Sequence, residues 1–163
     1  ALQYLASFKI SKTHIKKGIE NTIWHGRNQI IQNNPLIIFD VAHNSAGINE
    51  FLNYFNEFTK SGKTILILSL QKRKNIKSIT SKLLTIFDHI ICCETNNTRS
   101  MSLDDLSRQF NNFKKIQIIK SPNQAIYKAV SLIKNPCDKL AIIGTHHLGE
   151  PVSTIFKKSF NTL

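Results

Sequence analysis

Residues 35–55 read PLIIFDVAHNSAGINEFLNYF, an apolar run that changes into an amphipathic pattern within a few residues. Residues 35–39 are mostly isoleucine, leucine and phenylalanine, as in strands that are buried on both faces of a sheet. From Ile48 to Phe58 the apolar residues follow helical spacing and form one stripe. The stretch therefore predicts a buried strand, a polar turn that begins at Asp40, and an amphipathic helix.

The same alternation continues along the rest of the chain. Further apolar runs, mostly rich in β-branched residues, occupy residues 64–68, 89–93, 115–119 and 139–143. Helical patterns occupy residues 76–87, 102–113, 121–133 and 151–160. This alternation of strands and helices predicts an α/β domain, Rossmann-like, with a mostly parallel sheet and helices on both faces.

The composition is that of a globular protein. The chain has 163 residues, of which 41% are hydrophobic and 20% charged, enough for one domain with a core. No apolar run reaches the roughly 20 residues of a membrane helix, so we expect no membrane partner. The expected location is a reducing cytoplasm, which fits the cysteine pattern. The three cysteines include no C-x-x-C pair, and Cys92 and Cys93 would point to opposite faces of one strand. Buried free thiols are expected.

The formal net charge of +12 leaves three interpretations open. A coding bias toward lysine and asparagine is the simplest, and attraction of anionic small substrates is the second. A nucleic-acid-binding face is the third. However, the lysines are scattered, and no aromatic residues are interleaved with them as a base-stacking platform requires. We therefore expect no nucleic-acid partner, although a basic α/β binding module remains an alternative.

Polar residues follow the first predicted strand, and ligands of such folds bind beyond the carboxyl ends of the strands. Asp40 could accept hydrogen bonds from ribose hydroxyls, hold a metal ion, or merely close an Asx turn. His43 could contact a phosphate or move a proton, or simply lie in solvent. Asn44 or Ser45 is expected to cap the next helix, whose first N–H groups offer an anion site.

Two later loops add further candidates. Lys74 could meet a carboxylate or belong to a solvated charge run, and the hydroxyl of Thr145 could be exposed at the sheet edge. His146 and its histidine neighbour are expected to diverge at a helix start. A metal site that joined His146 to Asp40 and His43 would require three loops to converge, and we expect no metal ligands in this chain.

Several nucleotide-binding and nucleophile motifs are absent from the sequence. There is no G-x-G-x-x-G after a strand, no G-x-x-x-x-G-K-[ST] phosphate loop and no G-x-S-x-G elbow. The 10 acidic residues form no evident catalytic pair. On its own the domain lacks a phosphate-binding cradle, which predicts half of a site that another domain completes.

The segment IWHGRNQIIQNNPLIIFDVAHNSAGINEFLNYF (23–55) resembles the opening of the C-terminal domain in the folylpolyglutamate synthase and dihydrofolate synthase family of the Mur ligase superfamily. That family shows W-x-G-R, a strand pair and then D-G-A-H-N-P. The stretches NTRSMSLDDL (97–106) and DKLAIIGTHHLGEPV (138–152) are similar to later segments of the family. The matching positions of the first segment are Trp24, Gly26, Arg27, Asp40, Ala42, His43, Asn44 and Gly47.

The resemblance implies an ATP-dependent ligase that adds L-glutamate to dihydropteroate, to reduced folates or to both, through an acyl phosphate. In the family a central domain carries the P-loop, the Mg²⁺ sites and much of the pterin site. Residues 1–24 would then be the end of that ATPase domain and a linker, and residues 25–163 the glutamate ligase domain. ATP and Mg²⁺ would be the cofactors. The protein would be a monomer with its ATPase domain in the same chain, and the isolated domain would be inactive.

The resemblance also implies roles for individual residues. Arg27 would reach the ATP phosphates, since a guanidinium suits phosphoryl charge. Asp40 would orient the nucleotide at its ribose. His43 would lie near the phosphates or the incoming glutamate, and it would be catalytic together with Arg27. The residues that would hold glutamate are Asn44, Ser45, Lys74 and Thr145.

Some positions depart from the family pattern. Val41 replaces a glycine, and Ser45 replaces a proline. The D-K-D loop of the family reads RKN (73–75) here, which keeps the lysine but loses its acidic neighbours, so that glutamate affinity or domain closure would differ. Thr145 replaces a serine and keeps the hydroxyl. A Mur-type ligase for another acid or amino acid remains an alternative function.

Overall fold

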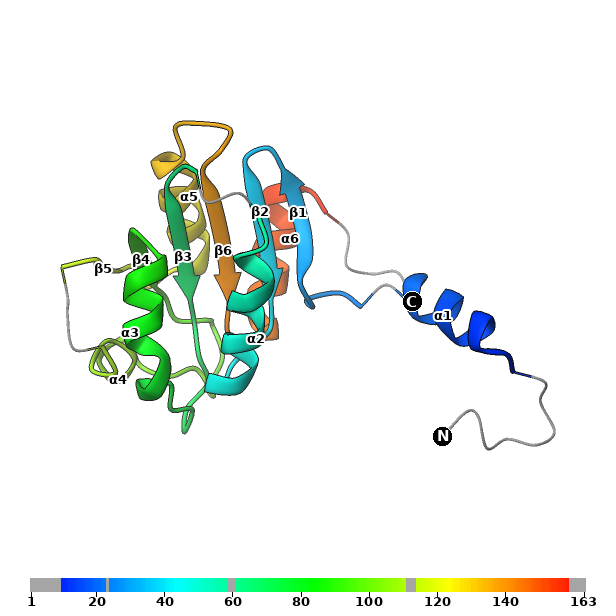
Figure 1. The fold of residues 1–163 in the computed structure, drawn as a ribbon. Helices are drawn as coiled ribbons and strands as arrows, with labels where there is room; N and C mark the ends of the chain where they lie inside the picture. Colours follow the sequence, from blue (N-terminus) through cyan, green and yellow to red (C-terminus); the bar gives the residue numbers. More distant parts are fainter. Residues whose placement is uncertain (1–9, 23, 59–60, 111–113, 159–163) are drawn as a thin grey trace.

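The computed structural model describes residues 10–22, 24–58, 61–110 and 114–158. These residues contain a six-stranded sheet in the order β1-β2-β6-β3-β4-β5, with helices on both faces (Figure 1). The strands are β1 (Gln29–Asn33), β2 (Leu36–Asp40), β3 (Thr64–Leu68), β4 (His89–Cys92), β5 (Ile116–Ile118) and β6 (Lys139–Ile143). The helical segments are α1 (Lys12–Glu20), α2 (Ser45–Phe55), α3 (Lys77–Ile86), α4 (Leu103–Ser107), α5 (Pro122–Leu132), the 3₁₀ turn η2 (His146–Leu148) and α6 (Gly149–Phe156).

The predicted α/β class with a mostly parallel sheet is confirmed. Strands β2 to β6 pair in parallel, and β1 runs antiparallel to β2 at one edge. Each predicted strand is present. The bounds of β3 and β6 match the prediction, β4 ends one residue earlier, β2 is shifted by one residue, and β5 is shorter by one residue at each end. The strand β1 is not among the predicted runs, because only Ile31 of its five residues is buried and its sequence carries little apolar pattern.

The sheet separates two apolar cores, because successive side chains of a strand point to opposite faces. On one face, Ile38 and Leu66 pack in a core that includes residues of α2 and α3. On the other, Ile37 and Ile67 pack in a core that includes residues of α5 and α6. Full burial of one such side chain stabilises the fold by roughly 1.5–3 kcal/mol. Both cores therefore hold the central strands in a defined position.

The carboxyl ends of the three central strands lie level with one another. Asp40 of β2 and Leu68 of β3 both lie opposite Ile143 of β6. The loops that follow these strands therefore leave the sheet at one edge, which is the lower edge in Figure 1. This edge carries most of the predicted site residues.

The cysteines differ partly from the prediction. Cys92 and Cys93 lie in opposite cores as expected, and burial raises the pKa of each thiol to about 12. Such thiols stay protonated and unreactive near neutral pH. Cys137 is exposed, and the prediction of a buried thiol is wrong for it because it lies in the loop before β6.

Three helices differ from their predicted bounds by more than one residue. The helix α2 ends at Phe55, whereas the predicted stripe runs to Phe58. The helix α4 ends at Ser107, although Phe110 beyond it is still buried, and the predicted end at residue 113 lies outside the described residues. The helix α6 begins at Gly149 rather than at Pro151. Proline is tolerated within the first turn of a helix, where N–H groups have no intrahelical partner, so it does not mark the first residue here. Residues 159–160 of that prediction lie outside the described part of the chain.

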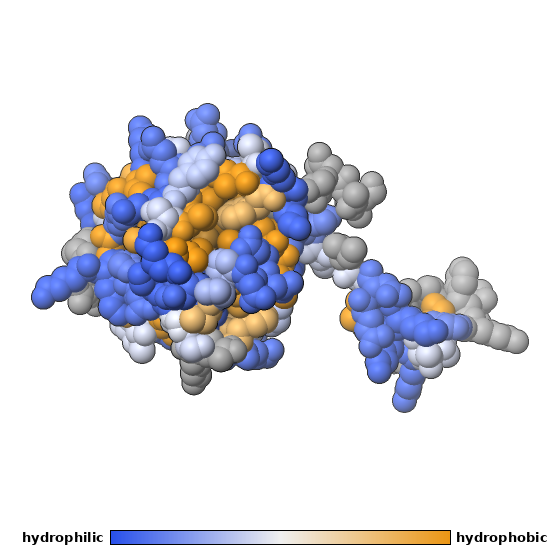
Figure 2. Space-filling view, turned by 90° about the horizontal axis from the view of Figure 1, so that it is seen from above, coloured by the Kyte–Doolittle hydropathy of each residue, from blue (hydrophilic) through white to orange (hydrophobic). Residues whose placement is uncertain are grey.

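The helix α1 stands apart from the sheet and its covering helices in both Figure 1 and Figure 2. A capping box of Ser11 and His14 starts it, and none of its residues is buried. Ile19 and, just beyond the helix, Trp24 are 70% and 72% exposed. Among the described residues, no helix has the length and apolar character needed to cross a membrane.

Candidate functional site

The turn before β1 carries Arg27 and lies against the loop that follows β2. Gly26 has a φ of 74°, and a Cβ there would lie 2.9 Å from Cγ1 of Val41. The Val41 N–H donates to the Gly26 carbonyl at 2.8 Å, and the Arg27 N–H donates to the Trp24 carbonyl at 3.1 Å. Only glycine combines this left-handed backbone with so close an approach, which explains its place before Arg27. The Arg27 side chain is exposed beside the sheet edge.

Asp40 binds this turn to the end of β2 through both carboxylate oxygens. Its Oδ2 accepts the Asn28 N–H at 2.6 Å, and its Oδ1 accepts the Ala42 N–H at 2.7 Å. The side chain is only 5% exposed. The bond to Ala42 is the Asx turn that the sequence allowed, and the bond to Asn28 is a contact across twelve positions of the chain that it did not suggest.

The orientation of His43 is set by its own loop. Its Nδ1 lies 2.9 Å from the carbonyl oxygen of Val41. A carbonyl can only accept, so Nδ1 carries the hydrogen and donates it. The neutral ring therefore has Nε2 as its acceptor, available to a ligand or to a proton.

Thr145 reaches the same edge through an unusual backbone. Gly144 has a φ of 124°, and a Cβ at this position would lie 1.9 Å from the carbonyl oxygen of Ser69. Glycine is therefore required where the chain leaves β6 and crosses the end of β3. Thr145 is 3% exposed, and its Oγ1 accepts the N–H of His147 at 3.3 Å.

These elements surround a cleft of about 190 Å³ at the carboxyl edge of the sheet. Arg27, His43 and Thr145, which the sequence named from separate segments, all line it. Gln71 and His146 line it too. Both belong to strand-end loops noted in the sequence. His146 was considered there only as a metal ligand, and Gln71 was assigned no role, because nothing in the local pattern distinguishes it from its neighbours. The cleft joins a cation, an imidazole and a hydroxyl, which suits an anionic ligand.

Four predicted residues lie outside the lining of this cleft: Asp40, Asn44, Ser45 and Lys74. Asn44 is the N-cap of α2, as predicted, and its Oδ1 accepts the Gly47 N–H at 2.8 Å. The Ser45 hydroxyl donates to the Asn75 carbonyl at 3.3 Å and accepts from the Ser78 hydroxyl at 2.9 Å. These bonds join the start of α2 to the loop and helix that follow β3.

Lys74 belongs to that loop, and its backbone is held from inside the protein. Its carbonyl accepts a bond from Nε2 of the buried Gln109 at 3.1 Å, and Oε1 of Gln109 accepts the Ile76 N–H at 2.7 Å. Lys74 itself is half-buried. Gln109 is thus a positioning residue that no sequence pattern indicated, since its partners lie about 35 residues earlier in the chain.

The two adjacent histidines contradict the prediction that their side chains diverge. The ring centroids of His146 and His147 are 4.0 Å apart, because both residues lie in the tight turn η2. Burial, with further contributions from His146 and Arg99, lowers the pKa of His147. His147 is therefore held mainly neutral near pH 7, because burial and neighbouring positive charge both disfavour the protonated ring.

A metal site is not formed by the described residues. They include no group of three or more His, Cys, Asp and Glu side chains that could hold an ion, so Asp40, His43 and His146 do not converge in that way. Both oxygens of Asp40 instead serve backbone N–H groups.

Comparison with known proteins shows which family this chain resembles. The model of the Mur ligase glutamate ligase domain matches residues 26–146. Dihydrofolate synthase/folylpolyglutamate synthase of Buchnera aphidicola subsp. Baizongia pistaciae is 29% identical over 130 residues, which cover 80% of this chain and 30% of that protein. Its namesake from Buchnera aphidicola subsp. Acyrthosiphon pisum is 30% identical over 142 residues, which cover 87% and 34%.

Solved structures share the fold. FolC of Escherichia coli in complex with DHPP and ADP has a TM-score of 0.78 at 22% identity, over 93% of this chain and 36% of that one. A bifunctional folylpolyglutamate synthase/dihydrofolate synthase with Mn, AMPPNP and L-glutamate bound has a TM-score of 0.81 at 21% identity, over 96% and 37%. The chain spans about a third of the length of these relatives. With a family model that covers most of its residues and the fold of that family, the chain belongs to the Mur ligases, as their glutamate ligase domain.

Proposed function

We propose that this chain is the C-terminal part of an ATP-dependent ligase that adds L-glutamate to dihydropteroate, to reduced folates or to both. The observation that carries the proposal is the family match across residues 26–146 together with the cleft that joins Arg27, His43 and Thr145. The curated relatives carry the name dihydrofolate synthase/folylpolyglutamate synthase, which favours folate substrates over those of other Mur ligases.

The residues present fit one wall of a nucleotide site. The cleft of about 190 Å³ is smaller than the roughly 300–1,000 Å³ that enclose a ligand of drug size. An exposed guanidinium suits phosphate groups, whereas the described residues offer no acidic cluster for Mg²⁺. A second domain in the same protein would supply the phosphate loop and the metal ligands. Residues 1–24 would be the end of that domain and the linker.

ATP, when bound, supplies the phosphoryl group that activates the carboxylate of the acceptor as an acyl phosphate. In our proposal Arg27 binds the phosphate oxygens and spreads their charge. The free Nε2 of His43 lies at the same cleft and takes a hydrogen bond or a proton from the incoming amine. Asp40 contributes by holding the Arg27 turn, and its remaining lone pairs accept from the ribose.

Glutamate would lie between the cleft and the loop after β3. Thr145 contacts it from within the cleft, and Lys74 pairs with a carboxylate from the neighbouring loop. Asn44 retains its amide NH₂ as a donor, since only its Oδ1 serves as the helix cap. Ser45 holds the loop and α2 together. The isolated chain is inactive in this proposal, and the complete protein acts as a monomer in the cytoplasm.

The test uses the complete protein that contains this chain. ADP release is followed with Mg²⁺, ATP and L-glutamate, with dihydropteroate in one reaction and tetrahydrofolate in another. We expect turnover with at least one pterin, and a loss of about 10²–10³-fold in kcat for Arg27→Ala. Lys158→Ala, which removes an exposed charge two residues beyond α6, is the matched control and keeps full activity.

The acceptor also decides between related ligases. Turnover with UDP-sugar peptides and with neither pterin would refute the folate assignment and keep the Mur-type chemistry. A folded protein that binds ATP but turns over no acceptor would refute the ligase proposal itself. Retention of activity in Arg27→Ala would refute the role of the cleft.

A further inference from the structure

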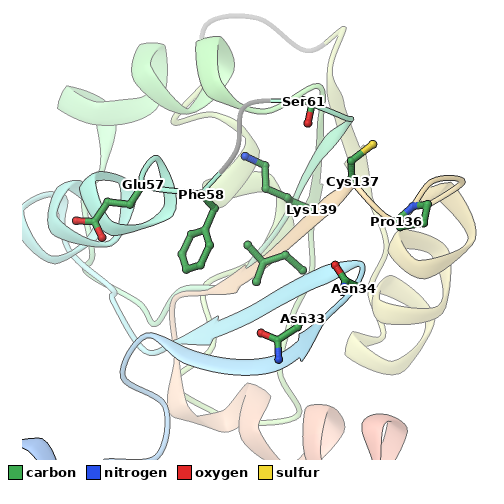
Figure 3. Close-up of a pocket in the computed structure, with 9 residues that line it drawn as sticks. Asn33, Asn34, Glu57, Phe58, Ser61, Pro136, Cys137 and Lys139 are labelled. Atoms are coloured by element: carbon green, nitrogen blue, oxygen red, sulfur yellow. The ribbon is translucent and has the colours of Figure 1, made fainter.

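A second hollow, of about 520 Å³, lies at the opposite edge of the sheet. The hollow and the cleft lie at opposite ends of β6. Lys139, at the hollow, begins that strand, and Thr145, at the cleft, follows its end. Its wall includes the turn between β1 and β2, the residues just after α2 and the loop before β6 (Figure 3). The volume is within the roughly 300–1,000 Å³ that enclose small molecules. Nothing in the proposed ligase reaction uses this hollow.

A buried cation lines the hollow. Lys139 is only 5% exposed, which is rare for lysine. Its Nζ lies 5.0 Å from the centroid of the Phe55 ring, an arrangement that stabilises the charged form. Its backbone N–H donates to the Lys63 carbonyl at 2.8 Å, so β6 fixes where the side chain starts. An ammonium has three N–H donors, and it can bind a ligand in addition to contacts within the chain.

Apart from Glu57, the other residues of the wall are apolar or carry neutral polar groups. Figure 3 shows the Lys139 ammonium on the side of Phe58 and Ser61, and the Glu57 carboxylate pointing away from it. Leu36 and Phe58 supply apolar surface, and the amides of the β1–β2 turn supply hydrogen bonds. Figure 2 views this end of the sheet and shows apolar residues gathered at its centre with hydrophilic ones around them.

We propose that the hollow binds a small organic carboxylate. The Lys139 ammonium pairs with the carboxylate, and Leu36 and Phe58 contact the apolar body of the ligand. A charge-assisted bond in a partly dry site is stronger than the same bond in water. Because Lys139 is already buried in place, its side chain loses little further freedom when the ligand binds.

Benzoate and its neutral analogue benzamide are the probes. Their binding to the complete protein, without nucleotide, is measured by titration calorimetry. We expect benzoate to bind at least tenfold more tightly than benzamide. Lys139→Met removes that preference while keeping an unbranched, mostly apolar side chain that is one atom shorter. Lys134→Met, at an exposed position nearby in sequence, keeps the preference.

Two further variants locate the site. Arg27→Ala keeps the preference, because Arg27 lies at the cleft on the other edge. Phe58→Ala weakens both probes together, and this half-buried position can be tested even if Lys139→Met does not fold. Equal binding of the two probes by the wild type, a preference that survives Lys139→Met, a preference lost in Arg27→Ala, or benzoate affinity unchanged in Phe58→Ala would each overturn the proposal.

Discussion

The substitution Asp40→Asn is expected to loosen the turn that carries Arg27. In the native protein the two carboxylate oxygens of Asp40 accept the N–H groups of Asn28 at 2.6 Å and Ala42 at 2.7 Å. Asparagine has one acceptor oxygen and one NH₂ group. Whichever way the amide is turned, one of the two backbone donors then faces another donor.

The size of the effect follows from the number and type of bonds. A hydrogen bond to a charged group contributes about 1.5–3 kcal/mol, and a neutral acceptor makes a bond of roughly half that strength. Loss of one bond and weakening of the other therefore lower the free energy of unfolding by about 2–4 kcal/mol. For a domain of 163 residues the shift is about 2–4 °C per kcal/mol, so the midpoint of the unfolding transition of this domain falls by about 4–16 °C.

Thermal and urea unfolding of the complete protein, followed by circular dichroism, measure this loss. Asp104→Asn is the control, since Asp104 is an exposed acid in the first turn of α4, where the change costs about 0.3–1 kcal/mol. If Asp40→Asn is no more destabilising than Asp104→Asn, the reasoning is wrong.

The same variant separates positioning of Arg27 from contact with the nucleotide. If Asp40 acts through Arg27, the losses of kcat in Asp40→Asn and Arg27→Ala are less than additive in the double variant. If Asp40 also accepts from the ribose, the wild type discriminates between ATP and 3′-deoxy-ATP, and Asp40→Asn discriminates less. Additive losses would refute the positioning role.

Three further predictions concern other parts of the chain. Arg27→Lys keeps the charge but loses the planar fork, so we expect a tenfold or greater loss of kcat by ADP release, and full activity would contradict phosphate binding by the guanidinium. Gly144→Ala places a Cβ 1.9 Å from the Ser69 carbonyl oxygen at a φ of 124°, and urea unfolding is expected to show a loss of more than about 2 kcal/mol. The backbone N–H of Lys134 is the leading cause that lowers the pKa of Asp138, with further bonds from Lys63 and Asn135. The contribution of the Asp138 carboxylate to stability is therefore fully present above the ordinary aspartate pKa of about 3.9. It is lost as the pH falls through the lower pKa that Asp138 has in the folded protein. Asp138→Asn should flatten this acid limb of a stability profile, and an unchanged limb would contradict the assignment.

Local patterns in the sequence predict most of the fold. The apolar runs specify β2, β3, β4 and β6, because buried parallel strands need β-branched and apolar residues at every position. The cap at Asn44 follows from hydrogen bonding within three residues. The strand β1 is different, since only Ile31 in it is buried and its pairing depends on the neighbouring strand.

For the candidate site, too, some residues could be predicted from the sequence and some contacts could not. Its sequence suggested Arg27, His43 and Thr145 through strand-end positions and a family resemblance, and those three residues do share one cleft. Only the tertiary structure revealed that Asp40 holds the Arg27 turn, and that Lys139 is buried beside a second hollow. Such contacts join segments far apart in the chain, and they depend on how helices and strands pack. The spacing of apolar and polar residues along the sequence predicts which helix or strand a residue belongs to. The packing of those helices and strands decides which other residues its side chain contacts.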